Sequence, residues 1–264
     1  KLEYRLGLGE APVIDAWLLS DLDDYFTWRG VPTLAPAWAV GLSLTNKHTV
    51  LVRHGLGPNR QVVDIATTFD HELAHVAVDV ARRGQPVPRW FNEGFASWSA
   101  GEWSLERAEL VSRSAAQGLL LPMQKIEETF PDHQHSTSLA YAQSHHFVQH
   151  MATTYGDDVF AEILGHIADG ETFSVAFTYA TGDDFEAVEY AWRTALMEHT
   201  SPLSNLVDGT WLFFGASLMF LLAWYVRRRR SREKFEHLDD DVTGWDYDPS
   251  RYRLPGQDVQ AARS

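Results

Sequence analysis

The feature that most constrains this chain is a pair of histidines separated by three residues. His71 and His75 stand in the segment His-Glu-Leu-Ala-His, within residues 60–83, whose apolar spacing and length predict an amphipathic helix. On a helix, residues four apart share one face, so both imidazoles can reach one metal ion. Glu72, next to the first histidine, is placed to act as a general base toward a water molecule there. This segment therefore predicts a helix that carries part of a metal centre.

A third ligand is required, because a catalytic zinc normally holds three protein ligands and keeps a fourth position open. Glu93 is the candidate, in the segment Trp-Phe-Asn-Glu-Gly-Phe-Ala of residues 90–96. The 17 residues between His75 and Glu93 include Gln85-Pro-Val-Pro88, which cannot continue a helix. The chain can therefore turn and send back a second helix, beginning near Phe91, that points Glu93 at the same metal.

Composition narrows the chemistry of the site and its partners. The chain has no cysteine, so any metal must be held by nitrogen and oxygen. Lys and Arg number 22 against 36 Asp and Glu, and the net charge of −14 argues against nucleic acid as a partner. A chain of 264 residues with 45% apolar content can bury one sizeable core. One compact catalytic domain is therefore expected.

The order of the predicted elements indicates an α+β domain over residues 1–205. Residues 11–18 read as a strand, and residues 37–53 read as a hairpin around a polar turn. From residue 60 to 199 the pattern is that of successive helices. We expect a small antiparallel N-terminal sheet followed by a mainly helical part.

An uncharged apolar run follows this domain. Thr210 to Val226 spans about 25 Å as a helix, at the short end of what crosses a bilayer, and Arg227 to Arg230 follow directly. A buried core helix is the alternative, but four arginines after an apolar run with aromatic edges favour a membrane exit. The prediction is a transmembrane helix over residues 206–230 and a disordered cytoplasmic tail over 231–264, with residues 1–205 outside the cytoplasm.

His71-Glu-Leu-Ala-His75 together with residues 90–96 resembles the gluzincin metallopeptidases, which combine an HExxH helix with a downstream glutamate. It looks closest to the peptidase MA-like domains of bacterial membrane and envelope proteins, and residues 90–96 are similar to the corresponding aminopeptidase N segment. The resemblance implies that His71, His75 and Glu93 bind zinc. It also implies that Glu72 is the general base and proton shuttle.

A downstream segment, Ala140 to Met151, resembles the helix that bears a catalytic tyrosine in these families. Tyr141 is the matching position, and its hydroxyl would donate a hydrogen bond to the oxyanion of the tetrahedral intermediate. A tyrosine packed at a helix start is the alternative. The Gly-x-Met-Glu-Asn segment with which aminopeptidases hold a substrate's free amine is absent, which favours an endopeptidase.

Other polar residues near these motifs have weaker assignments. Asp79, one turn after His75, and Asn92, beside Glu93, are possible partners of the metal ligands, with surface solvation the alternative for Asp79. Two histidine groups invite further metal sites, but a packed or solvated role is favoured for both; they are His145, His146 and His150, and His133 and His135.

Together these observations predict a single-pass, membrane-anchored zinc metallopeptidase that acts on peptides or proteins outside the cytoplasm. A competing hypothesis is a catalytically silent gluzincin-fold module that binds envelope proteins. A third is zinc-dependent hydrolysis of a non-peptide amide. Metal content separates the second hypothesis from the first, since a silent module has no need for the full set of ligands and base.

Overall fold

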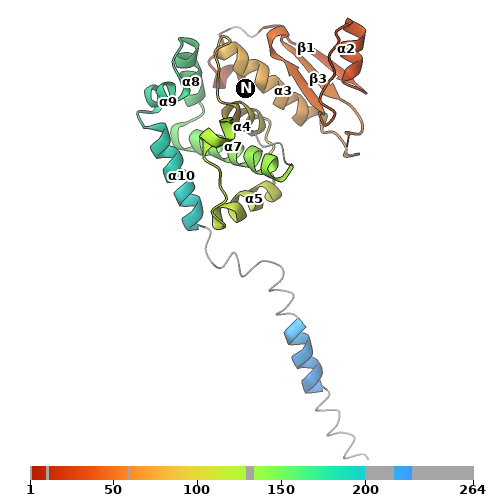
Figure 1. Ribbon diagram of the computed structural model, residues 1–264, viewed down its shortest axis with the longest axis vertical. Coiled ribbons are helices and arrows are strands. Elements are labelled where there is room, and N and C mark those ends of the chain that lie inside the picture. The colour runs from red at the N-terminus through yellow and green to blue at the C-terminus, as the bar shows by residue number, and fades with distance from the viewer. Residues whose placement is uncertain (1, 10–11, 59, 129–133, 200–216, 228–264) are drawn as a thin grey trace, which may run out of the picture. The chain divides into compact units, whose positions relative to one another are not determined.

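A computed structural model describes residues 2–9, 12–58, 60–128, 134–199 and 217–227 (Figure 1). The chain divides into two compact units, Lys1–Thr200 and Ser201–Ser264. In chain order, the elements of the first unit are α1 (Leu2–Arg5), β1 (Asp15–Leu19), α2 (Asp23–Arg29), β2 (Gly41–Leu44), a 3-10 turn η1 (Thr45–Lys47), β3 (Thr49–Arg53), α3 (Ile65–Ala81), α4 (Arg89–Ser99), α5 (Leu105–Ala116), α6 (Met123–Glu128), α7 (Gln134–Tyr155), α8 (Val159–Ala168), α9 (Phe173–Thr181) and α10 (Phe185–His199).

The sheet has three strands in the order β1-β3-β2. β2 pairs antiparallel with β3 as the predicted hairpin, whereas β1 pairs parallel with β3. The expectation of a purely antiparallel sheet is therefore wrong, although the α+β class is confirmed. Parallel pairing needs a crossover of a dozen or more residues, and residues 20–48, which include α2 and β2, supply it.

β3 is the central strand and its two faces pack against different helices. Val50 and Val52 face Val76 of α3, while Leu51 packs with Tyr25 of α2. Alternate residues of a strand point to opposite faces, so a fully apolar strand is buried on both sides. The sheet thereby fixes the position of α3.

α3 begins at Ile65, five residues after the predicted start, because Asp64 is its N-cap residue. The Asp64 carboxylate accepts a hydrogen bond from the backbone N–H of Thr67 at 3.1 Å. Farther along, the consecutive residues 74–78 are all buried, because α3 contacts the sheet and α4 (Figure 1). Packing on more than one side explains why the sequence fitted an amphipathic helix only loosely.

The helical part is built around the contact of α4 with α7. Phe91 and Phe95 of α4 are fully buried in a core that also contains Phe160 of α8. A Cβ atom at Gly94 would lie 2.6 Å from the backbone carbonyl oxygen of Ser144, far inside van der Waals contact. Glycine at this position therefore lets α7 approach the helix that carries Glu93.

Residues 217–227 are the described part of the second unit, and they form a helix. Within the described residues, no helix combines the length and the apolar character needed to cross a bilayer. The transmembrane span predicted over 206–230 lies partly outside the described residues, and the tail over 231–264 lies wholly outside them. Both stay predictions.

Candidate metal centre

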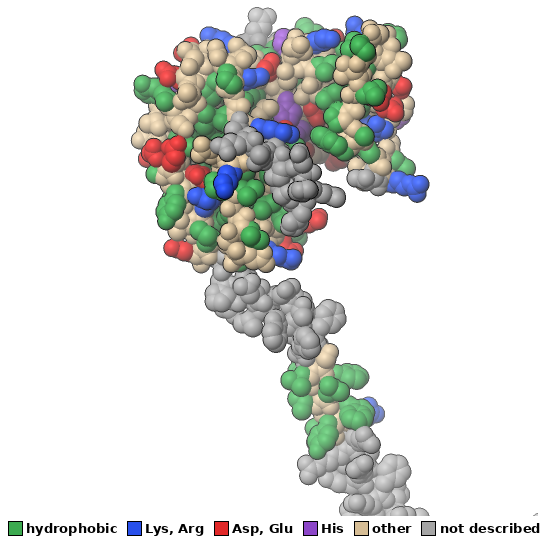
Figure 2. Space-filling view, in the orientation of Figure 1, with side chains coloured by type: hydrophobic (Ala, Val, Ile, Leu, Met, Phe, Trp, Pro, Cys, Tyr) green, Lys and Arg blue, Asp and Glu red, His purple; other side chains and the backbone are tan. Residues whose placement is uncertain are grey.

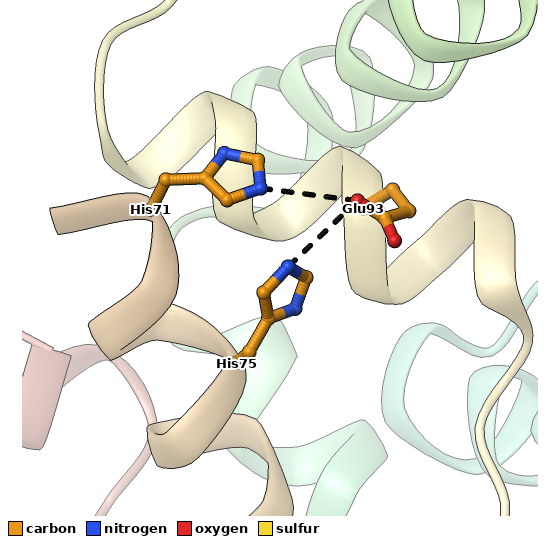
Figure 3. A group of neighbouring side chains, drawn as sticks. All are labelled: His71, His75 and Glu93. Atoms are coloured by element: carbon orange, nitrogen blue, oxygen red, sulfur yellow. Dashed lines mark ion pairs between the residues drawn. The ribbon is translucent and has the colours of Figure 1, made fainter. Parts of the chain in front are cut away.

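The two histidines of α3 project side by side toward α4 (Figure 3). Their ring centroids are 4.9 Å apart, as expected for residues one helical turn apart. The side chains of His71 and His75 are only 15% and 10% exposed. Their ring nitrogens are thus held in place and largely shielded from water.

Glu93 comes from α4, which runs back past α3 after the Pro-containing turn at residues 85–88. α4 begins at Arg89, two residues earlier than expected, so Glu93 lies in its second turn. Its Oε2 atom is 3.8 Å from His71 Nε2 and 3.7 Å from His75 Nε2 (Figure 3). One carboxylate oxygen therefore faces both imidazoles.

The spacing of these three atoms fits a shared metal ion. His71, His75 and Glu93 each offer one ligand atom, and the three lie within 4.8 Å of one another. Contacts of 3.7 and 3.8 Å are too long for hydrogen bonds, but atoms that each lie about 2 Å from one zinc ion stand roughly 3–4 Å apart. Two imidazoles and one carboxylate form a donor set typical of catalytic zinc.

A second carboxylate, that of Glu102, lies near the other ring nitrogen of His71. Glu102 Oε1 lies 2.9 Å from His71 Nδ1, on the opposite side of the ring from Glu93. The oxygen lies off the N–H direction, so this contact is an ion pair and not an aligned hydrogen bond. The other oxygen of Glu102 contacts the Arg107 guanidinium at 3.3 Å. A carboxylate at Nδ1 holds the proton there and leaves Nε2 free to bind a metal.

The electrostatics of the site favour a positive charge between the carboxylates. Burial disfavours a charged imidazole, but contacts with Glu102 and Glu93 outweigh it and raise the pKa of His71 to about 10. Burial likewise opposes charge on Glu93, yet His71 and His75 lower the pKa of its carboxyl group. A divalent cation at Nε2 would supply the positive charge that a proton otherwise provides.

Glu72 borders a cavity that His71, one of the three candidate ligands, also lines. The cavity measures about 230 Å³ and is lined by Trp38, Val40, Gly41, Thr68, His71, Glu72, Glu102, Arg107 and Tyr141. Burial raises the pKa of the Glu72 carboxyl, which makes it a better proton acceptor when ionised. A Cβ atom at Gly41 would lie 2.7 Å from Glu72 Oε1, so β2 passes directly over the glutamate. Figure 2 shows histidine side chains in the recess between the sheet and the helical part.

Tyr141, on α7, lines the same cavity from the helical side. Burial raises the pKa of its phenol to about 12, and the negative charge of Glu93 acts in the same direction. The hydroxyl therefore stays protonated near neutral pH and can donate a hydrogen bond. The structure thus places Glu72 and Tyr141 in the lining of one cavity.

The structure does not bring Asp79 or Asn92 to a ligand. Asp79 pairs with Arg82 one turn along α3, and Nδ1 of His75 has no hydrogen-bond partner among the described residues. Asn92 Oδ1 is buried and, in the same part of the chain, also has no partner. The histidine-supporting carboxylate is instead Glu102, which local spacing did not single out because it follows Glu93 by nine residues, beyond the end of α4.

His145 and His146 serve packing. His145 is buried, stacks on Trp103 and contacts Ser97 Oγ at 3.1 Å through Nδ1. His146 Nδ1 accepts a hydrogen bond from Trp192 Nε1 at 3.1 Å. Within the described ranges, His71, His75 and Glu93 form the one group of three side chains spaced for a metal. His133 lies outside those ranges.

An HExxH helix, a glutamate from the following helix and a tyrosine in the lining of the same cavity define a gluzincin-like peptidase domain. A family model described as the peptidase MA superfamily matches residues 28–198, and the chain belongs to that superfamily. Its members are typically zinc-dependent, in agreement with the donor set of His71, His75 and Glu93. No curated protein and no solved structure gives a significant match to the chain.

Proposed function

We propose that this protein is a zinc-dependent endopeptidase. The observation that carries the proposal is the convergence of one ligand atom each from His71, His75 and Glu93 within 4.8 Å of one another, together with a cavity lined by His71, Glu72 and Tyr141. When bound by these three side chains, zinc acidifies water and polarises a carbonyl group.

The residues around the site divide the proton chemistry between them. Glu72 takes a proton from the attacking water and later delivers it to the departing amine, a role suited to a buried carboxylate with a raised pKa. Tyr141 donates its hydroxyl hydrogen to the oxygen that becomes negative as the carbonyl carbon turns tetrahedral. Glu102 holds His71 in the orientation that points Nε2 at the site.

The extent of the recess supports cleavage within a chain. A second cavity of about 260 Å³, lined in part by Ser104, Leu110 and Ser138, shares Arg107 and Tyr141 with the first. The two cavities therefore adjoin at Arg107 and Tyr141, and we infer that together they accommodate an extended peptide on both sides of the scissile bond. The absence of an amine-binding Gly-x-Met-Glu-Asn segment agrees with this interpretation.

Metal analysis combined with digestion of a peptide library tests this proposal on the full-length protein. We expect one zinc per chain and internal cleavage of peptides. Glu72→Gln should keep its zinc and lose activity at least about 100-fold, the contribution of a general base. Asp70→Asn removes the same charge from an exposed neighbour on α3 and should stay active. A metal-free, inactive protein would support the binding module instead.

We further propose that the domain is anchored to the cell membrane from outside the cytoplasm. The support is the apolar run of residues 210–226 followed by four arginines. Because the chain has no cysteine, single introduced cysteines report topology directly. A membrane-impermeant maleimide should label Ser112→Cys, an exposed position of α5, on intact cells and Ser264→Cys only after lysis. Labelling of Ser264→Cys from outside would reverse the orientation.

A further inference from the structure

One side chain that lines the cavity of Glu72 and Tyr141 takes no part in the proposed reaction. Trp38 is 70% exposed, although it lines the cavity together with His71, Glu72 and Tyr141. Its indole has no hydrogen-bond, cation or ring partner among the described residues. A single exposed tryptophan is common on protein surfaces, so the informative observation is its position at the mouth of the site.

Trp28 provides a useful contrast, since it is 68% exposed. Its ring packs against Trp17 with centroids 5.1 Å apart, and the Arg29 guanidinium lies 5.4 Å from its ring centroid. Trp28 thus belongs to an aromatic cluster on α2 and β1, and it does not line the metal cavity. Trp38 and Trp28 are therefore similarly exposed for different reasons.

The segment around Trp38 is uncharged over its whole length. Residues 30–44 contain no charged side chain, and Val40 joins Trp38 in lining the cavity. The cavity lining also includes Arg107 and Glu102, which pair with each other. Trp38 and Val40 therefore offer an apolar surface at the sheet side of the site, where an apolar group of a bound molecule would lose contact with water.

The distance along the chain limits which part of a substrate reaches Trp38. Trp38 precedes Gly41 by three residues, and Gly41 lies directly over Glu72. Three residues span at most about 11 Å, so a side chain that packs on Trp38 belongs to a residue within about three positions of the scissile bond. Among the described residues β2 pairs only with β3, so its outer edge can hold an extended peptide along this path.

On the basis of the proposed peptidase function, we propose that Trp38 is a specificity-determining residue. It selects extended polypeptide segments that place a bulky apolar side chain, such as Leu or Phe, near the scissile bond. The cavity of about 230 Å³ is smaller than the roughly 300–1,000 Å³ of small-molecule sites, and it suits one large side chain at a time.

The test uses the full-length protein and peptides in which Leu or Phe replaces Ala at each of three positions on either side of the cleaved bond. We expect the wild type to prefer the bulky residue at one position. In Trp38→Ala the ratio of kcat/KM for the Leu or Phe peptide to that for the Ala peptide should fall about tenfold. In the control Trp28→Ala the ratio should not change. Thermal unfolding checks that both variants remain folded.

Equilibrium binding separates this inference from the peptidase proposal. In the Glu72→Gln background, Trp38→Ala should weaken binding of the Leu or Phe peptide by a similar factor, while Trp28→Ala should not. Unchanged preference and unchanged binding in Trp38→Ala, or equal losses in Trp28→Ala, would overturn the inference. Trp38-dependent peptide binding without hydrolysis by the wild type would refute the peptidase proposal and leave the subsite intact. If the wild type neither binds nor hydrolyses these peptides, both proposals are rejected.

Discussion

Replacing Glu102 with Gln tests whether the carboxylate behind His71 supports metal binding. The substitution keeps the size of the side chain and removes its charge, so Oε1 attracts the proton on Nδ1, 2.9 Å away, less strongly. Loss of such a partner typically weakens metal affinity 10- to 100-fold. Two features of the structure place the expected loss at the lower end of that range.

The first feature is that Arg107 contacts the other oxygen of Glu102 at 3.3 Å and so offsets part of its charge. The second is that the contact with His71 is not an aligned hydrogen bond. We therefore expect zinc affinity to fall about tenfold, equivalent to about 1.4 kcal/mol at 25 °C.

The assay is zinc competition against a chelator of known affinity at fixed pH, with thermal unfolding of the metal-free proteins as a check on folding. Glu109→Gln is the matched control, because Glu109 also pairs with an arginine, Arg113, but on the exposed face of α5. Equal zinc affinity in the wild type, Glu102→Gln and Glu109→Gln would refute the reasoning. So would an equal loss in both variants, since that would indicate a general effect of charge.

Three further predictions concern packing and protonation. Gly94→Ala should lower the free energy of unfolding by about 1–3 kcal/mol in urea titrations, because the new methyl group meets a backbone oxygen. The helical Gly165 faces open space, so Gly165→Ala should raise the free energy of unfolding by about 0.5–1 kcal/mol. Gly41→Ala should reduce kcat in peptide hydrolysis and lower the melting temperature without unfolding the domain, because the new methyl group meets Thr68 Cγ2 as well as Glu72 Oε1, each 2.7 Å away. Burial lowers the pKa of His145 to about 4, so stability should fall by on the order of 3 kcal/mol as pH drops from 6.5 to 4, and less steeply in His145→Gln.

The sign of the last prediction follows from proton binding. Between pH 4 and 6.5 the unfolded chain protonates the residue 145 imidazole while the folded chain does not, so acid favours unfolding. Identical pH slopes in the wild type and His145→Gln would contradict the prediction. A stable Gly94→Ala variant would show that α4 and α7 can separate at little cost. An unfolded Gly41→Ala variant would show that β2 cannot tolerate the methyl group.

The sequence by itself determined the local parts of this site. The spacing of His71 and His75 places them on one helical face through backbone geometry alone, and the proline-containing turn forces the chain to reverse before Glu93. Local patterns also predicted the hairpin of β2 and β3 and the helices that follow. These features depend on interactions between residues close in the chain.

The tertiary structure decided what depends on distant segments. Parallel pairing of β1 with β3 follows from a 29-residue crossover between residues 19 and 49, which local patterning cannot reveal. The contact of Gly41 with Glu72 and the return of Glu102 to His71 likewise join residues that no periodicity relates. Pairs of this kind are set by the packing of whole elements. The sequence therefore predicted the candidate ligands. The structure was needed to place Glu102 at His71 and the apolar side chains of Trp38 and Val40 beside the site.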